Sequence, residues 1–350
     1  MEVKSLIDKL SKNNYLNKEE LLYLLNNMND YHKNYLFQKS NDTRKRFYEN
    51  KVYLRGLIEI SNYCIRDCMY CGIRKSNSKA QRYRLSEEEI VSCAVKGDEL
   101  GYKTIVLQGG EDPYFSDDIL ADIIRKIKTK LPDNAITLSL GERSFKSYKK
   151  LYDAGADRYL LRHETSNRQL YEKLHPNANF DNRRRCLIDL KEIGYQIGAG
   201  FMVGLPGQNN EDLVNDLLYL KELEPHMCGI GPFIPQKDTP LGLEKGGTCE
   251  KTVILLAIIR LLLPNVLLPA TTALSTISAT GREEGLRAGA NVIMPNLSPL
   301  NVRSKYSLYD GKKYLDIESA EYREKIEKDI NEIGFSIDIS RGDNISWKRK

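Results

Sequence analysis

Apolar, strand-like runs alternate with amphipathic helical segments along most of the chain, and this alternation constrains the fold more than any other feature. Eight such runs fall between residues 52 and 295, and each is followed by a segment with helical periodicity. Glycines stand just past four of the helical segments, in ELGYKT, DAGADR, EIGYQI and RAGANV, where a left-handed residue commonly ends a helix. The pattern predicts an α/β fold of the (β/α)8 TIM-barrel type, with a partial barrel of six units as the alternative.

The expected elements divide the chain into three parts. Residues 1–50 are predicted to form a helical extension, because Leu21, Leu24, Leu25 and Met28 recur at helical spacing after Asn17, a suitable N-cap. Residues 51–310 carry the predicted strands at 52–60, 104–108, 135–140, 157–161, 196–203, 227–234, 266–271 and 290–295. Residues 311–350 are predicted to contain one last amphipathic helix, at 318–335, and a tail.

Charge and cysteine usage exclude several classes of protein. The net charge is only +5, and its basic and acidic residues are interleaved, which argues against a nucleic-acid-binding role. The N-terminus has no apolar signal region, and the most apolar segment, 253–264, is too short to span a bilayer. Seven cysteines without a paired framework are typical of a reducing compartment, so we expect a cytoplasmic protein with no membrane partner.

Three of the seven cysteines lie within eight positions, directly after the first predicted strand. Cys64, Cys68 and Cys71 have the spacing Cys-x3-Cys-x2-Cys, and no fourth Cys or His is near them in sequence. A structural zinc site requires four ligands, whereas three thiolates on a [4Fe–4S] cluster leave one iron open to a small molecule. The spacing therefore favours an iron–sulfur cluster, with zinc-binding or incidental cysteines as the alternative.

A glycine pair follows the second predicted strand, in LQGGEDP (107–113). Gly109 and Gly110 permit a ligand to approach the backbone where a side chain would block it, and Glu111 comes next. A glycine-rich turn is the ordinary interpretation of such a pair. Its position one barrel unit after the cysteines favours a binding role.

Polar side chains also occur where later predicted strands end, which in a barrel is the functional face. LLRHET (160–165) places Arg162, His163 and Glu164 in a row, with a buried Arg–Glu pair as the structural alternative. His175 follows a helix and is interpreted as structural. The remaining candidates at strand ends are Ser139, Met202, Thr271, Thr272, Ser275, Met294 and Asn296. The threonine and serine hydroxyls could equally be helix N-caps.

Several of these motifs together carry a family resemblance. They are SNYCIRDCMYCGIR, QGGEDPY, LSLGE, DRYLLRHET, GAGFMVGLPGQ, GIGPFIP, PATTA and GANVIMPN. They resemble the radical S-adenosylmethionine (SAM) superfamily and, more narrowly, the HydE family of [FeFe]-hydrogenase maturases, over about residues 50–310. The RHET and GIGPFIP stretches separate the chain from biotin synthase and methylornithine synthase, relatives of similar architecture.

The resemblance implies a full barrel with an internal cavity, and a site at its top for a [4Fe–4S] cluster and SAM. Cys64, Cys68 and Cys71 would hold the cluster, which on reduction cleaves SAM to methionine and a 5′-deoxyadenosyl radical. The residues implied to contact SAM or the cluster are Tyr70, Gly109, Gly110, Glu111, Ser139, Arg162, Glu164, Arg183, Met202, Met294 and Tyr306. Those assigned to the substrate are Thr271, Thr272, Ser275 and Asn296.

The same resemblance implies a role in assembling the two-iron subcluster of the hydrogenase H-cluster. The substrate would be a small iron–cysteine–carbonyl–cyanide complex delivered by the maturase HydG, with the maturase HydF and an electron donor as further partners. Some members carry a second iron–sulfur site built from three C-terminal cysteines. Here no cysteine follows Cys249, so no accessory cluster is expected.

Two other functions remain open on the sequence. The first keeps the chemistry and changes the substrate, as in an amino-acid mutase of the methylornithine synthase type. The second is a cluster- or zinc-bearing nucleic-acid-binding protein, suggested by NDTRKRFYENK and the basic end SWKRK. Basic runs at chain ends are usually solvated tails, which argues against nucleic acid as a partner.

Overall fold

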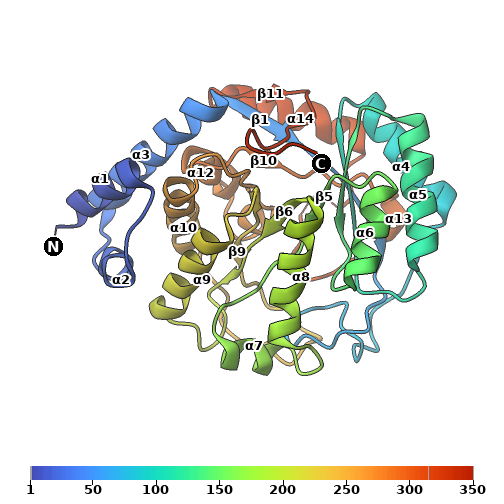
Figure 1. The fold of residues 1–350 in the computed structure, drawn as a ribbon, viewed down its shortest axis with the longest axis horizontal. Helices are drawn as coiled ribbons and strands as arrows, with labels where there is room; N and C mark the ends of the chain where they lie inside the picture. Colours follow the sequence, from blue (N-terminus) through green and yellow to red (C-terminus); the bar gives the residue numbers. More distant parts are fainter. Residues whose placement is uncertain (1, 314, 350) are drawn as a thin grey trace.

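The computed structural model describes residues 2–313 and 315–349, in which parallel strands form a barrel surrounded by helices (Figure 1). The strands are β1 (Lys51–Leu54), β2 (Gly56–Ser61), β3 (Thr104–Gly109), β4 (Ala135–Ser139), β5 (Arg158–Leu160), β6 (Gln196–Ala199), β7 (Met202–Val203), β8 (Met227–Cys228), β9 (Gly231–Pro232), β10 (Val292–Ile293) and β11 (Ser336–Asp338). Their order confirms the predicted α/β class.

The barrel closes through short bridges as well as regular strands. Six strands form one parallel sheet in the order β2-β3-β4-β5-β6-β8. The circuit continues through bridges from Met227 to Leu267 and from Pro269 to Val292, and it returns to β2 through the bridge between Asn296 and Leu57. The run 266–271 thus takes the seventh position and 290–296 the eighth, which confirms the eight-unit barrel over the six-unit alternative.

Helices follow the strands around the barrel, as the sequence pattern predicted. They are α4 (Glu87–Glu99), α5 (Asp117–Lys130), α6 (Phe145–Asp153), α7 (Arg168–Leu174), α8 (Phe180–Ile193), α9 (Asn210–Leu223), α10 (Cys249–Leu262), α11 (Thr272–Ile277), α12 (Gly281–Arg287) and α13 (Leu300–Arg303). The four glycines singled out in the sequence, Gly101, Gly155, Gly194 and Gly289, all have positive φ values, between 84° and 120°. Each therefore supplies the left-handed conformation that ends a helix before the next strand.

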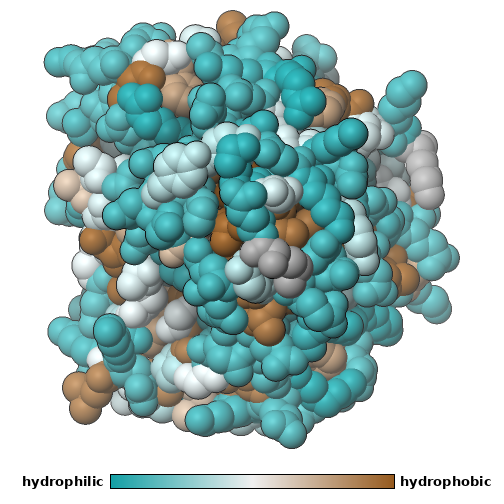
Figure 2. Space-filling model, turned by 90° about the vertical axis from the view of Figure 1, so that its left-hand side faces the viewer, coloured by the Kyte–Doolittle hydropathy of each residue, from teal (hydrophilic) through white to brown (hydrophobic). Residues whose placement is uncertain are grey.

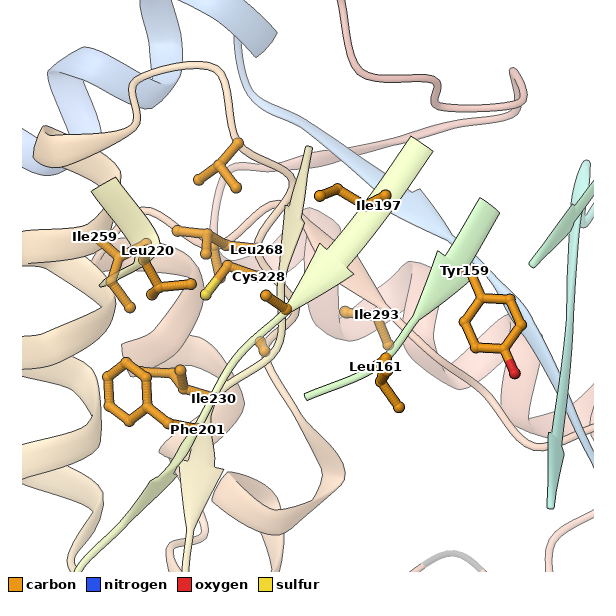
Figure 3. Close-up of a cluster of buried hydrophobic side chains, with 14 of the residues drawn as sticks. Tyr159, Leu161, Ile197, Phe201, Leu220, Cys228, Ile230, Ile259, Leu268 and Ile293 are labelled. Carbon is orange, nitrogen blue, oxygen red and sulfur yellow. The ribbon is translucent and has the colours of Figure 1, made fainter. Parts of the chain in front are cut away.

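The main core lies between the outer side of the barrel and these helices. Figure 3 shows Leu220 of α9 and Ile259 of α10 beside Cys228 and Leu268 of the barrel wall. α10 is buried along nearly its whole length, because the barrel covers one side and α3 (Asp30–Tyr48) the other. This double coverage explains why 253–264 is the most apolar segment of the chain. No helix in residues 2–313 and 315–349 has the length and apolarity needed to cross a membrane.

The N-terminal residues form three helices, α1 (Val3–Asn13), α2 (Lys18–Asn26) and α3. Asn17 caps α2 as expected, within a capping box that also uses Glu20. The side of the molecule on which α1 and α2 lie is covered mainly by hydrophilic residues (Figure 2).

The C-terminal residues include a strand that the sequence analysis did not predict. After α14 (Ser319–Glu332), β11 pairs in parallel with one edge of β1, while β10 pairs with the other edge. One residue of the basic end is held against the barrel: Arg349 donates hydrogen bonds to the carboxylate of Asp157 and to the carbonyls of Tyr152 and Ala156. The expectation of a solvated tail is therefore wrong for Arg349, whereas Lys348 is exposed.

Candidate functional site

The three cysteines lie in the loop after β2, at the end of the barrel where the parallel strands finish. All three are free and partly buried. The Sγ of Cys64 accepts hydrogen bonds from the backbone N–H groups of Arg66 (3.4 Å) and Glu111 (3.3 Å). N–H donors aimed at sulfur favour a thiolate over a thiol, which suits a metal-ligating cysteine.

The glycine pair after β3 packs directly against this loop. A Cβ atom built on Gly110 would come within 2.1 Å of the Tyr63 carbonyl oxygen and 2.8 Å of the Cys64 Cβ. Glu111 in turn accepts a backbone hydrogen bond from Ile65 at 2.9 Å. Gly110 is required because only a glycine allows the two segments to lie this close.

Burial raises the pKa of all three thiols, and that of Cys71 to about 12. In the absence of a bound cation the thiols are therefore protonated at neutral pH, and metal binding would have to displace the protons. Within the described part of the chain, no group of three or more His, Cys, Asp or Glu side chains is arranged around a single metal ion. The donor set of three thiols beside a glycine cradle fits a [4Fe–4S] cluster with one iron left open.

A network of buried ion pairs joins the cysteine loop to the next strand ends. Arg66 donates to Glu111 at 2.7 Å and to Glu142 at 3.0 Å, and the Nε of Arg183 lies 2.9 Å from Glu142. Gly141, with φ of 76°, makes room for Glu111, since a Cβ there would meet the Glu111 Cγ at 2.0 Å. Arg183, which the resemblance implied to contact SAM or the cluster, is thus already paired with a carboxylate of the protein.

Glu164 is the residue with the strongest sign of a missing partner. Its carboxylate is largely buried, with Oε1 3.3 Å from the Arg162 Nε, while Oε2 has no hydrogen-bond partner among residues 2–313 and 315–349. Its backbone is left-handed, with φ of 67°, which costs a non-glycine residue roughly 1 kcal/mol or more. An unpaired buried carboxylate oxygen on a strained backbone is typical of a ligand-binding position.

Tyr70 and Met202 lie in a small apolar cluster beside the cysteine loop. It contains Leu170, Leu174, Met202, Leu205, Phe233 and Leu241, with Met69 and Tyr70 packed against them. The Tyr70 hydroxyl is 2.9 Å from the Nε2 of His175, whose Nδ1 is 2.8 Å from the Tyr171 carbonyl. Burial and the charge of Arg183 lower the pKa of His175 to about 3. His175 is therefore neutral and orients Tyr70, which agrees with its structural interpretation.

Polar side chains form a layer inside the mouth of the barrel. Glu59, Gln108 and Ser139 are in register on β2, β3 and β4. Gln108 Nε2 lies 3.4 Å from the Tyr306 hydroxyl, so Tyr306 reaches this layer. Asn296 donates to the buried carboxylate of Glu59 at 2.8 Å.

Lys312 reaches the same layer from the C-terminal segment. Its Nζ lies 2.5 Å from the Glu59 Oε1 and donates to the Tyr306 carbonyl at 3.3 Å. The segment that carries Lys312 also contacts the cysteine loop, since Gly72 donates a backbone hydrogen bond to Leu308 at 3.1 Å. The residues after the eighth strand therefore cross the mouth of the barrel.

A pocket deeper in the barrel has a cationic end. It is lined by Arg55, Val106, Thr137, Leu160, Met227, Cys228, Gly229, Leu267, Pro269, Val292 and Met294. The Nε and Nη2 of Arg55 have no hydrogen-bond partner in the described part of the chain, although the side chain is buried. Such a group suits an anionic or strongly polar ligand.

The hydroxyls predicted for the substrate come from the loop after the seventh strand. Thr271 precedes α11 without capping it through its side chain, and Thr272 begins the helix. The Oγ1 of Thr271 and the Oγ of Ser275 are buried and lack hydrogen-bond partners among the residues described. They are therefore not helix caps, and their hydroxyls are available to a ligand.

The sequence identified the residue types at the strand ends but missed several that hold them in place. Glu59, Arg66, Glu142 and Lys312 take part in the ion pairs of the site. The only signal for Glu142 is its position two residues after a predicted strand, in LSLGE, where the prediction names Ser139. Nothing in the local sequence distinguishes the others from surface charges.

Comparison with known proteins agrees with this arrangement. The model of the radical SAM superfamily matches residues 58–220. The chain is 52% identical over 277 residues to the [FeFe] hydrogenase maturase subunit HydE of Thermotoga maritima, a match that covers 79% of each chain. It is 31% identical over 319 residues to 3-methylornithine synthase of Methanosarcina acetivorans, which covers 89% of each.

Solved structures support the fold. The maturase HydG from Carboxydothermus hydrogenoformans superimposes with a TM-score of 0.81 at 24% identity, covering 96% of this chain and 79% of that one. At this identity the similarity is evidence of a shared barrel only.

Proposed function

Because the chain belongs to the HydE family of [FeFe]-hydrogenase maturases, within the radical SAM superfamily, we propose that it cleaves SAM reductively during assembly of the hydrogenase two-iron subcluster. The observation that carries the proposal is the cysteine loop packed against the Gly-Gly-Glu segment, next to the unpaired carboxylate of Glu164. We place this chemistry in the cytoplasm, where thiols remain reduced.

Cys64, Cys68 and Cys71 are the proposed ligands of one [4Fe–4S] cluster. Bound there, the cluster supplies the electron that splits SAM into methionine and a 5′-deoxyadenosyl radical. The backbone N–H groups of Arg66 and Glu111 stabilise the Cys64 thiolate. No cysteine follows Cys249, so we propose that the accessory cluster is absent.

SAM is proposed to lie between the glycine pair and the ends of β4 and β5. Glu111 and the backbone of Gly109 and Gly110 are the proposed contacts of its amino group. Glu164, beside Arg162, offers the free Oε2 to the ribose or the ammonium group. The other proposed SAM contacts are Tyr70, Ser139, Arg183, Met202, Met294 and Tyr306. Arg183 would share its charge between Glu142 and the SAM carboxylate.

The substrate is proposed to bind below SAM, inside the barrel. The hydroxyls of Thr271 and Ser275, with Thr272 and Asn296, are the proposed contacts for polar groups of the substrate, and the buried guanidinium of Arg55 lines a pocket in the barrel. A small anionic iron complex with carbonyl and cyanide ligands, made by HydG and passed on towards HydF, fits this chemistry. We propose it as the substrate.

Two assays on anaerobically reconstituted protein test the function. We expect dithionite and SAM to give 5′-deoxyadenosine, and we expect the protein to restore hydrogenase maturation in an extract that lacks the HydE component. The alternative, favoured by the 31% identity to 3-methylornithine synthase, predicts that lysine is rearranged instead. A lysine-derived isomer without hydrogenase maturation would overturn the maturase assignment, and failure to cleave SAM would overturn both.

Glu164→Gln is expected to weaken SAM binding about tenfold, because it removes the charge and one acceptor from the SAM pocket. The melting temperature is expected to fall only slightly, because Oε2 has no partner to lose among the described residues and the Arg162 side chain, which pairs with Oε1, is 34% exposed. Isothermal calorimetry with SAM and thermal denaturation measure the two effects. Glu172→Gln, on the exposed face of α7, is the matched control and should change neither. Unchanged SAM affinity in Glu164→Gln would remove this residue from the site.

A further inference from the structure

A buried carboxylate on α9, outside the barrel wall, contacts the residues on both sides of the left-handed turn at Glu164. We infer that Asp216 is a positioning residue that holds Glu164 in its SAM-binding conformation. The inference rests on the proposed contact between Glu164 and SAM. It adds a residue that touches neither SAM nor the cluster and that no motif pointed to.

The side chains after β5 alternate between the two sides of the barrel wall. Arg158 and Leu160 lie on the inner side, where Leu160 lines the pocket, while Tyr159 and Leu161 belong to the outer core. His163 follows the outer set, and its ring packs edge-on against Tyr219 of α9 at 4.9 Å between centroids. His163 therefore points away from Glu164, although the two are neighbours in sequence.

Asp216 binds the chain on both sides of Glu164. Its Oδ1 accepts a hydrogen bond from the backbone N–H of Ser166 and lies 3.3 Å from the Nε2 of His163. Glu164 itself is held to the next strand, because its N–H donates to Gly200 at 3.1 Å and its carbonyl accepts from Met202 at 3.1 Å. One carboxylate thus fixes the residue before the strained position and the residue two places after it.

The packing of α9 against the barrel does not explain why position 216 carries a carboxylate. Asp216 is fully buried, and burial raises its pKa, so an apolar residue would be less costly there. Asp216 Oδ2, His163 Nδ1 and Tyr219 OH all lack hydrogen-bond partners in the described part of the chain. The polar contacts that Asp216 does make are with the segment that carries Glu164. The carboxylate of Asp216 is therefore explained by its contacts with the Glu164 turn and not by the packing of α9.

The test compares two aspartates of α9 that bind the same loop. Asp212 accepts from the Asn167 side chain at 2.8 Å, beyond the Glu164 turn, and serves as the control. Asp216→Ala removes the acceptor for Ser166, whereas Asp216→Asn keeps an oxygen in its place. SAM affinity is measured by calorimetry on the reconstituted protein, and amide hydrogen exchange is followed over residues 163–166 in each variant.

We expect Asp216→Ala to weaken SAM binding about tenfold and to speed exchange in 163–166, and Asp216→Asn to restore the affinity to within about threefold. Asp212→Ala should leave SAM affinity within about twofold of the parent. In a Glu164→Gln background, Asp216→Ala should add less than twofold, because it acts through the residue already changed. Equal losses in both alanine variants, or additive losses with Glu164→Gln, would overturn the inference. If Glu164→Gln alone changes nothing, the proposed SAM contact fails instead.

Discussion

Replacing Cys64, Cys68 and Cys71 together with alanine is expected to abolish iron binding, from about four irons per chain to a background level. Each cysteine supplies one thiolate, and no sequence neighbour can substitute for it. Anaerobic reconstitution followed by iron and sulfide analysis measures the loss. Electron paramagnetic resonance after dithionite should give a cluster signal that SAM alters in the parent, and no signal in the triple variant.

The matched control is Cys93→Ala, on α4 and outside the loop after β2. Cys93 is partly buried against the main core, and it lies outside the Cys-x3-Cys-x2-Cys motif. We expect it to keep the full iron content. Circular dichroism should show that the triple variant is folded, because the three side chains contribute only the edge of the core. A folded triple variant that still binds four irons would contradict the assignment.

The barrel could be predicted because its signals are local. Each helix that ends at Gly101, Gly155, Gly194 or Gly289 carries its own stop residue, and the positive φ values at these positions follow from the lack of a side chain. The seventh strand was predicted at residues 266–271. It takes that place in the barrel, but it pairs through two isolated bridges only. Pro269 explains this, since it has no N–H to donate to a regular ladder.

In the functional site, too, the residues with local sequence signals could be predicted and those without such signals could not. The cysteines and the glycine pair are contiguous motifs, so their spacing alone indicated a cluster. The groups that orient them are distant in sequence: Arg66 meets Glu142 across 76 residues and His163 meets Asp216 across 53. A single sequence gives no means of pairing such residues, because nothing in their neighbouring sequence distinguishes them from charged residues on the surface.

The floor of the barrel offers the clearest example of a contact that the sequence concealed. Arg158 is fully buried, and it donates to the carbonyl of Arg341 and to the Oδ1 of Asp343, both at 2.7 Å. These partners come from the segment after β11, which the sequence analysis interpreted as a tail. Gln196 also donates to Asp343, at 3.0 Å, so the segment closes the end of the barrel opposite the cysteines.

Asp343→Asn is expected to destabilise the protein by about 2 kcal/mol at pH 7, because it leaves the buried charge of Arg158 without its counter-charge. Burial opposes ionisation of Asp343, but the charges of Arg158 and Arg341 outweigh it and lower its pKa to about 2. The carboxylate of an unfolded chain titrates near pH 3.9. The stabilisation is therefore complete above about pH 5, shrinks as the pH falls through about 3.9 and is lost as it falls through 2.

Urea denaturation of parent and variant between pH 7 and pH 2.5 measures this difference directly. The difference between their free energies of unfolding should stay constant down to about pH 5 and then shrink. Below that pH the Asp343 carboxylate of the parent becomes protonated, whereas the variant has no such group to lose. The control is Asp329→Asn, on the surface of α14, which changes the net charge by the same amount without altering the barrel. It should change the free energy of unfolding little at any pH. A gap that is absent at pH 7, or that persists undiminished at pH 2.5, would mean that the C-terminal segment does not neutralise Arg158. The closed floor would then have to depend on the backbone and amide contacts of that segment.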